Sequence, residues 1–483
     1  MSERPWSNDI PDGPWDAIVI GSGIGGMSSA ALLSKLGKRV LVLEQHNIPG
    51  GFTQTFKRPG FRWDVGVHIV GEMSERSFPG RLLGDLSDGR LEWEPVGEVY
   101  DEFNFPGGFK IQFPDSPEAF RANLHEAFPD DKVAIDQYID LVKQVARAGS
   151  ASLQARPVPR YLAPGKRKVM AAARPHWKAT TQEVLDGLTD NDQLKAVLAA
   201  QWGYYGDPPS KSSFAMHAMM VRHFMRGAFY PVGTAQTMAP AILQTVADAG
   251  GWTAVRRRVE EITTSGNKVT GVRLDDGTTI DAKTVLSAAG AVQTSAMVGD
   301  EWEPDYDVAG PAHLSLYLGF EGIDIEKAGA TKQCQWFYES WDHDQVLWEV
   351  GPGIEPGRAP CLFTSFPSTK DPSHDPGDEQ RHTGEIVTFV PWDAFAEWDG
   401  TKWKRRPEEY DAFKQMLTDA LLAQFAEHFP DLALHIVHAE LSTPVSTTHF
   451  TEAHHGSIYG LATEPSRFLD GGLEPKTPIK GLY

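Results

Sequence analysis

The sequence predicts an α/β fold with a second, interleaved α+β domain, and three observations carry this prediction. Two short apolar runs, at residues 16–20 and 39–44, flank a helix-like segment near the start of the chain. Strand-like patterns return at residues 259–290, around an Asp-Gly turn. The chain has 483 residues, a length beyond what a single hydrophobic core usually organises. We therefore expect two domains, each assembled from separate stretches of sequence.

The elements near the start form a complete βαβ unit. Residues 16–20 are a β-branched apolar run that ends at glycine, which is typical of a buried parallel strand. Segment 26–36 carries small residues and then leucines, and Gly37 is placed to end a helix. Residues 39–44 are a second buried strand, which ends in Glu44.

The loop between strand and helix, Gly21-Ser22-Gly23-Ile24-Gly25-Gly26, is typical of dinucleotide binding. Gly21 permits the tight turn, Gly23 lets the backbone approach a pyrophosphate, and Gly26 lets the helix lie close to the strand. The helix N-terminus offers free N–H groups to the phosphates. Glu44 stands near the position from which an acid binds a ribose, and this context favours a ligand over a plain glycine turn.

The glycine pair Gly50-Gly51 favours FAD, because it keeps the backbone free of side chains beside a longer dinucleotide. The unit therefore predicts a Rossmann-type FAD-binding domain of the three-layer, glutathione-reductase-like kind. Only one GxGxxG lies between a strand and a helix. The expected reductant is therefore a transiently bound NAD(P)H or another protein. The predicted FAD contacts are Gly21, Gly23, Ile24, Gly25, Gly26, Glu44, Gln45, Gly50, Gly51, Val259, Ala289 and Gly290.

The composition of the rest of the chain divides it between two domains. Residues 91–246 and 294–433 are rich in aromatic residues and methionine or broken by proline, so we assign them to the substrate or cap domain. Residues 1–90, 247–293 and 434–483 are assigned to the FAD-binding domain.

Composition excludes several classes of function. A formal net charge of -20 argues against nucleic acid as a partner. Cys334 and Cys361 have neither disulfide-framework nor zinc-ligand spacing, which fits a reducing compartment. Residues 1–15 lack the pattern of a secretory signal, and no apolar run is long enough to span a bilayer. We expect a cytoplasmic protein, with peripheral membrane contact as an option.

Six segments spread over the chain carry a family resemblance, namely 17–26, 40–46, 66–71, 214–218, 227–231 and 456–460. In order and approximate spacing they resemble the phytoene desaturase and carotenoid isomerase superfamily of flavoproteins, and within it the all-trans-retinol saturases (all-trans-retinol 13,14-reductases). The resemblance implies an FAD-dependent oxidoreductase that saturates or desaturates a C=C bond of a hydrophobic isoprenoid or polyene, of retinoid or carotenoid type, by hydride transfer at flavin N5.

The sequence departs from the family pattern at two places. Gly233-Thr234 stands where the family usually has a glycine pair, which predicts a differently shaped loop near the flavin ring. The chain ends at residues 480–483, before the family's Leu-x-Gly-x-Asp turn and final helix. We therefore expect an FAD-binding domain truncated at its C-terminal part.

Three residues in the matching segments are candidates for the catalytic site: His68, Tyr230 and Tyr459. Each has a plainer interpretation, as a hydrogen-bonded core histidine or a packed aromatic side chain. His449, His454 and His455 lack an acid or cysteine at ligand spacing, so we assign no metal.

Two segments bear on substrate access. Residues 214–230 concentrate methionine and phenylalanine, which suits an apolar tunnel but equally a core helix. Residues 156–178 carry basic side chains and no Asp or Glu, interleaved with Tyr161, Leu162 and Trp177. This segment is either a surface for anionic membranes or a solvated basic loop.

Two rival functions stay open. A redox-neutral carotenoid cis-trans isomerase would leave the product mass unchanged, whereas saturation adds two hydrogens. A non-enzymatic prenyl-binding protein, of the Rab escort kind, shares the broad architecture, but the intact GxGxxG, Glu44 and Gly50-Gly51 argue against it.

Overall fold

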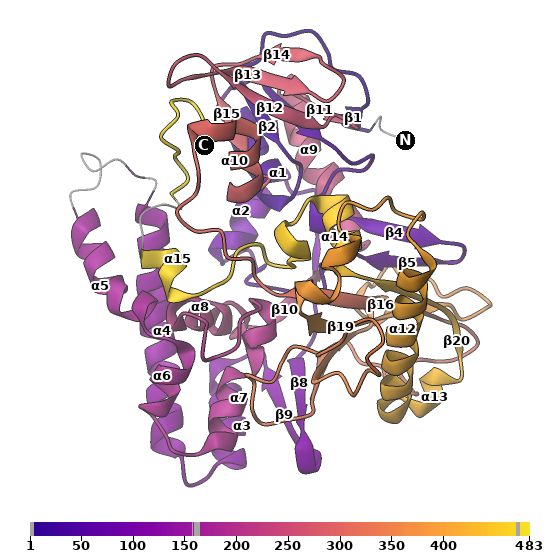
Figure 1. The fold of residues 1–483 in the computed structure, drawn as a ribbon. Coiled ribbons are helices and arrows are strands. Elements are labelled where there is room, and N and C mark those ends of the chain that lie inside the picture. Colours follow the sequence, from indigo (N-terminus) through magenta and orange to yellow (C-terminus); the bar gives the residue numbers. More distant parts are fainter. Residues whose placement is uncertain (1–3, 157, 159–164, 470–473) are drawn as a thin grey trace.

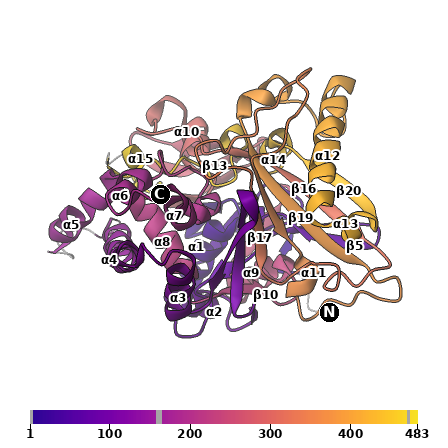
Figure 2. The same ribbon diagram turned by 90° about the horizontal axis from the view of Figure 1, so that it is seen from below.

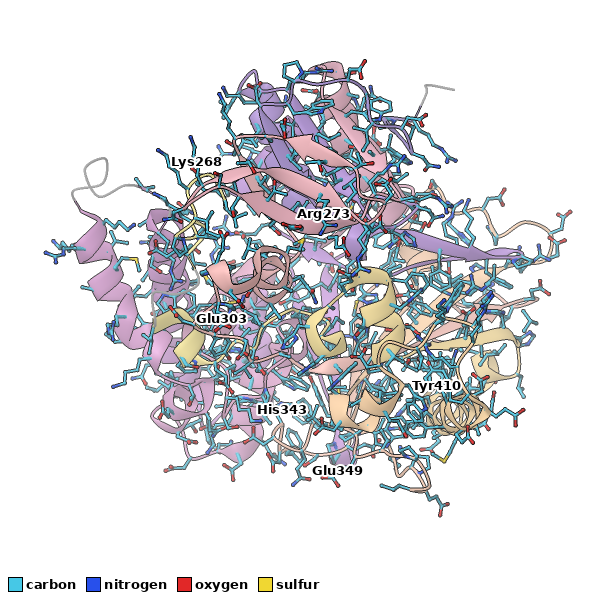
Figure 3. All side chains as sticks on the ribbon, turned by 45° about the horizontal axis from the view of Figure 1, so that its top comes forward. Lys268, Arg273, Glu303, His343, Glu349 and Tyr410 are labelled. Carbon is cyan, nitrogen blue, oxygen red and sulfur yellow. The ribbon has the colours of Figure 1, made fainter. Side chains whose placement is uncertain are left out.

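The computed structural model describes residues 4–156, 158, 165–469 and 474–483. The chain folds into two lobes (Figure 1). The upper lobe contains strand β1 and the last residues of the chain, and the lower lobe has helices on one side and a large sheet on the other. In Figure 3, Arg273 marks the upper lobe and Tyr410 the sheet side of the lower lobe.

The upper lobe is built on a parallel sheet, with helices on one face and an antiparallel meander on the other. In sheet order the parallel strands are β1 (Trp6–Ser7), β11 (Trp252–Val255), β3 (Val40–Glu44), β2 (Ala17–Ile20) and β15 (Val285–Ser287). The covering helices are α1 (Ile24–Lys35), α2 (Phe78–Leu86) and α9 (Met238–Asp248). The meander consists of β12 (Val259–Thr264), β13 (Val269–Leu274) and β14 (Thr279–Asp281).

Strand β2 shows how the sequence produces these three layers. Its side chains alternate across the sheet. Val19 packs in the core beneath the helices, whereas Ile18 and Ile20 pack against the meander. Both faces are thus covered, which is why the strand is apolar throughout. The predicted three-layer Rossmann-type domain is confirmed, as is the Asp276-Gly277 turn that joins β13 to β14.

The lower lobe is built on a seven-stranded mixed sheet that separates two hydrophobic cores (Figure 2). In sheet order its strands are β20 (Ile436–Ser442), β16 (Ala312–Phe320), β19 (His382–Val390), β18 (Cys361–Ser365), β17 (Cys334–Tyr338), β8 (Val99–Phe105) and β9 (Phe109–Pro114). One core contains α3 (Pro117–Ala127), α4 (Lys132–Ala155), α5 (Lys166–Lys178), α6 (Thr181–Asp186), α7 (Asp192–Ala199) and α8 (Phe214–Phe224). The other core lies beneath α12 (Glu408–His428).

Shorter elements connect the two lobes. The hairpin of β4 (Thr55–Arg58) and β5 (Phe61–Asp64) packs on the large sheet, where the Trp63 indole N–H donates to the Leu318 carbonyl over 2.8 Å. A small sheet joins β6 (Val70–Gly71), β10 (Ala228–Pro231) and β7 (Trp93–Pro95). The remaining helices are α10 (Ala291–Val298), α11 (Pro367–Lys370), α13 (Pro430–Ala433), α14 (Pro444–Thr451) and α15 (Pro465–Leu469).

Two predicted domain boundaries differ from the structure. Helix α9, most of which we assigned to the substrate domain, packs against α1 in the upper lobe. Strand β20, assigned to the FAD-binding domain, pairs with β16 in the lower sheet. An amphipathic helix or a half-buried strand has the same pattern whichever core it faces, so composition could not place these two elements.

Two bulk expectations can be compared with the structure. Cys334 and Cys361 are both buried free thiols. Among the helices of the described residues, none combines the length and the apolar character needed to cross a lipid bilayer.

Candidate active site

A cleft of about 920 Å³ opens where the parallel strands of the upper lobe end. Ile20, Glu44 and Ser287 line it from the carboxyl ends of β2, β3 and β15. The glycine loop 21–25 forms the adjoining wall at the start of α1, and residues 450–454 and 457–461 form the opposite wall. Crevices at the carboxyl ends of parallel strands are where open α/β sheets bind ligands.

The geometry of the loop explains its glycines. A Cβ atom at Gly26 would lie 2.1 Å from the Gly21 carbonyl oxygen, so only glycine lets α1 start this close to β2. At Gly51, which has a φ of +54°, a Cβ atom would lie 3.1 Å from the Gly23 Cα atom. Gly23 and Gly25 differ, because a Cβ atom on either would meet no atom within 4 Å. They present bare backbone to the open cleft, which fits an extended phosphate-bearing ligand beside the helix N-terminus.

Glu44 is buried beside this loop and holds it in place. One carboxylate oxygen accepts from the Ser22 N–H over 2.9 Å and from the Ser22 hydroxyl over 2.5 Å, and the other accepts from the His46 N–H over 2.8 Å. A carboxylate has about four acceptor positions, so one remains for a ligand hydroxyl. The Ser22 hydroxyl in turn accepts from the Gly50 N–H over 3.1 Å, which joins the glycine pair to the loop.

The cleft collects most of the predicted cofactor contacts. The predicted residues that line it are Gly21, Gly23, Ile24, Gly25, Glu44, Gln45, Gly51, Val259, Ala289 and Gly290. Gly26 and Gly50 lie behind this wall and act through packing and hydrogen bonding. Arg258 and Arg467 also line the cleft and were not predicted, since no local motif distinguishes them. Their position follows from how the meander and α15 pack.

The last residues of the chain belong to the same wall. Tyr483 donates its N–H to the Val285 carbonyl over 3.0 Å and accepts from the Ser287 N–H over 2.9 Å, alongside β15. The side chain of Tyr483 lines the cleft. The end of the described chain therefore extends the parallel sheet.

Two of the three predicted catalytic residues, His68 and Tyr230, lie between the lobes in a cluster that we call the polar cluster. The Tyr230 hydroxyl donates to Asp64, whose other carboxyl oxygen accepts from the Ala235 N–H over 3.0 Å. His68 Nδ1 lies 2.8 Å from Glu385 Oε2. The polar cluster consists of Asp64, His68, Tyr230, Lys370 and Glu385.

Burial dominates the electrostatics of the polar cluster. Burial first, and then the neighbouring Glu385, raise the pKa of Asp64 to about 7, against the hydrogen bonds from Tyr230 and Ala235 that lower it. Burial also raises the pKa of the Glu385 carboxyl, although the Lys370 ammonium opposes this rise. The pKa of His68 is lowered, first by burial and then by Lys370. These directions favour uncharged carboxyls and an uncharged imidazole near neutral pH.

Lys370 is the basic member of the polar cluster and is almost fully buried. Its ammonium donates to the Ser365 hydroxyl over 2.6 Å and to the His68 carbonyl over 3.4 Å. Within the described residues, no carboxylate lies close enough to Lys370 for an ion pair. Neither Lys370 nor Glu385 was predicted, because nothing near them in sequence distinguishes them from ordinary polar residues of a short helix or a strand.

The polar cluster lies next to the cleft, although His68 and Tyr230 do not line it. Gly66 packs on Phe52, where a Cβ atom would lie 3.2 Å from the Phe52 ring, and Phe52 lines the cleft. Ala312, at the start of β16, pairs with Ser457, another lining residue. Tyr459, the third candidate, does line the cleft, and the residue is 39% exposed.

Three further expectations from the sequence concern the methionine-rich segment, a metal site and the basic segment. Residues 214–224 form α8, which belongs to the lower core and contributes Phe214, Val221 and Phe224 to it, as the plainer interpretation expects. Within the described residues, no group of three or more His, Cys, Asp or Glu side chains is placed to hold a metal. Part of the basic segment, residues 157 and 159–164, lies outside the described residues and includes Arg160, Tyr161 and Leu162.

Comparisons with known proteins agree with this architecture. Residues 19–78 match a family model described as an NAD(P)-binding Rossmann-like domain. The chain is 30% identical to an all-trans-retinol 13,14-reductase of Danio rerio, over 97% of this chain and 81% of that protein. It is 26% identical to a chloroplastic prolycopene isomerase of Arabidopsis thaliana, over 97% of this chain and 78% of that one. An oxidoreductase from Methanosarcina mazei has a similar fold, with a TM-score of 0.60 at 16% identity, covering 97% of this chain and 93% of that one.

Proposed function

The chain belongs to the all-trans-retinol 13,14-reductase family, within the phytoene desaturase and carotenoid isomerase superfamily, and on this basis we propose that it is an FAD-dependent oxidoreductase. Its reaction adds hydrogen to, or removes it from, a C=C bond of a hydrophobic isoprenoid or polyene, of retinoid or carotenoid type. The observation that carries the proposal is the glycine-walled cleft at the start of α1, with Glu44 at its side.

The proposed cofactor is FAD, and the residues of the cleft fit it. The backbone of loop 21–25 would hold the pyrophosphate, and Glu44 the ribose hydroxyls. Val259 lines the cleft at the start of the meander, and residues 450–461 close it on the side of the lower lobe. When bound, flavin accepts or supplies a hydride at N5. A cleft of about 920 Å³ has room for so large a cofactor.

The protein's own contribution beside that cleft is a dry, apolar core. Buried aromatic side chains on the face of the large sheet that also carries Glu385 form part of this core, among them Phe363, Trp336 and Phe389. Such a core excludes water, which would otherwise compete for hydride and protons.

We propose NAD(P)H, bound transiently, or another protein as the electron source. Membrane contact through residues 156–178 is also proposed, because α5 exposes Arg167, Lys168, Arg174 and Lys178. Trp177 is not available for this contact, since it is buried and packs on Phe468 with ring centroids 4.3 Å apart. Charge-reversed α5 should no longer sediment with anionic liposomes, and unchanged sedimentation would contradict the proposed contact.

A redox-neutral isomerase is the second candidate, favoured by the likeness to prolycopene isomerase. One experiment tests both. FAD-loaded protein is reduced anaerobically and mixed with retinoids, carotenoids and other polyenes, while flavin absorbance and product mass are followed. Saturation reoxidises the flavin and adds two hydrogens to the product, whereas isomerisation does neither and yields a new isomer. If every polyene is returned unchanged, the proposed substrate class is wrong.

A further inference from the structure

The pair formed by His68 and Glu385 is the least expected feature of the polar cluster. The Glu385 side chain is completely buried, while 15% of the His68 side chain is exposed. Their nearest atoms, Glu385 Oε2 and His68 Nδ1, are 2.8 Å apart. None of the described side chains donates a hydrogen bond to the Glu385 carboxyl, which otherwise interacts with the backbone N–H of Asp64. Burial raises the pKa of this carboxyl to about 8, so at neutral pH it carries a proton that it can present to His68 Nδ1 at 2.8 Å.

The two ring nitrogens of His68 have different surroundings. Nδ1 is buried and faces Glu385, whereas Nε2 is not among the buried polar atoms and bonds to no described residue. The His68 ring also packs edge-on against Phe363, at 4.9 Å between ring centroids, which limits its rotation. A buried carboxyl that fixes one nitrogen of an imidazole leaves the other nitrogen free to exchange a proton.

The location connects the pair to the proposed chemistry. The segment from Asp64 to His68 runs behind Phe52, which lines the cleft, and the His68 ring packs on Phe363, so the pair lies between the cleft and the aromatic face of the large sheet. Several charged or titratable groups surround it from the neighbouring elements. They are Asp64 on β5, Tyr230 on β10, Lys370 on α11, and His313 and Tyr317 on β16.

Resting on the proposed function, we propose that His68 delivers the proton for C=C saturation and that Glu385 is the positioning residue that supplies it. The C=C bond accepts a hydride from reduced flavin at one carbon and the Nε2 proton of His68 at the other. His68 Nδ1 takes the carboxyl proton of Glu385 in the same step, so the imidazole stays neutral and the carboxyl becomes a carboxylate. A proton from water then enters at His68 Nε2 while the Nδ1 proton returns to the Glu385 carboxylate, and NAD(P)H or another two-electron donor restores the reduced flavin.

The experiment compares the wild type with Glu385→Gln and Glu385→Asp in single-turnover reoxidation of the reduced, FAD-loaded protein by a polyene. We expect the wild-type rate to fall as the pH rises through the titration of Glu385. Glu385→Gln should react about 100-fold more slowly, a typical loss for a removed general acid, and with a flat pH profile. Glu385→Asp should restore part of both the rate and the pH profile. Glu440→Gln is the matched control, since Glu440 lies on β20 of the same sheet, paired with Arg58 over 2.5 Å.

A second measurement does not depend on turnover. Infrared difference spectra of the FAD-bound protein should show a protonated-carboxyl band at neutral pH that is absent in Glu385→Gln and present in Glu440→Gln. The affinity for FAD should be equal in all variants, which shows that the fold is retained. A wild-type pH profile in Glu385→Gln, or an unchanged carboxyl band, would overturn the proposal. If no polyene reoxidises the wild-type flavin, the proposed function fails, while the infrared spectra still decide whether the pair holds a proton.

Discussion

Replacing Gly26 with alanine tests the central element of the cleft. The new methyl group would stand 2.1 Å from the Gly21 carbonyl oxygen and 3.2 Å from the Ala288 Cβ atom. Ordinary contact begins at 3.4 Å, so α1 and β2 must separate by about 1.3 Å to admit it. The obstructing oxygen belongs to backbone at the end of a buried strand and cannot turn aside.

Two opposing effects set the size of the change. Forcing a methyl group into a packed site costs about 1–3 kcal/mol. Alanine favours a helix over glycine by about 1 kcal/mol, which offsets part of that cost. We therefore expect the free energy of unfolding of the apoprotein to fall by up to about 2 kcal/mol. Displacing the N–H groups of the loop should also raise the Kd for FAD at least tenfold, which corresponds to about 1.4 kcal/mol.

Two further alanine variants separate packing from ligand contact. At Gly25 a Cβ atom meets nothing within 4 Å and faces the cleft, so Gly25→Ala should keep or slightly raise stability while weakening FAD binding. Gly84 lies in α2 with open space around its Cβ position, so Gly84→Ala should leave FAD binding unchanged.

Urea unfolding of the apoprotein and fluorescence titration with FAD measure the two quantities separately. Gly26→Ala should lose both stability and FAD affinity, Gly25→Ala affinity alone, and Gly84→Ala neither. If Gly26→Ala matched the wild type in both measurements, the close approach of α1 to β2 would not be a constraint on this fold. If Gly25→Ala bound FAD normally, the pyrophosphate could not lie along this wall.

Three other changes have defined outcomes. In Glu44→Gln an amide N–H₂ replaces an oxygen that accepts hydrogen bonds from the loop, so stability should fall by about 1–3 kcal/mol and the Kd for FAD should rise, as urea unfolding and titration would show. Trp63→Phe leaves the buried Leu318 carbonyl without its donor and should cost about 1–3 kcal/mol in urea unfolding, with FAD affinity unchanged. The pKa of Asp64 is raised to about 7, so its neutral form stabilises the fold fully below its ordinary value of 3.8, and this stabilisation is lost as the pH rises through 7. The contribution of Asp64 to apoprotein stability should therefore decline between about pH 4 and 7 in urea unfolding followed against pH, and Asp64→Asn should remove that contribution from the pH profile.

Local sequence was enough to predict the parts of the site that one βαβ unit supplies. One continuous stretch of sequence, residues 21–44, contains Gly21, Gly23 and Glu44. Each of the three has a role in the cleft that its residue type alone suggests. The polar cluster joins residues from β5, β10, α11 and β19, which only the pairing of distant strands brings together. Glu385 has an ordinary strand environment in sequence, and its significance follows from burial beside His68.

The sequence also left open whether His68 is an ordinary core histidine. Another histidine of this chain, His217, shows how the two ring nitrogens of a core histidine can be hydrogen-bonded. His217 is fully buried on α8 and satisfied on both nitrogens. The Tyr138 hydroxyl donates to the Leu198 carbonyl over 2.9 Å, so it must accept from His217 Nε2, 2.8 Å away. Nδ1 then accepts from the Tyr205 hydroxyl over 3.0 Å, which fixes the tautomer. His68 is not held at both ring nitrogens in this way, because only Nδ1 faces a partner. His217 thus has both nitrogens satisfied within the core, whereas His68 keeps Nε2 free, as an imidazole that exchanges protons requires.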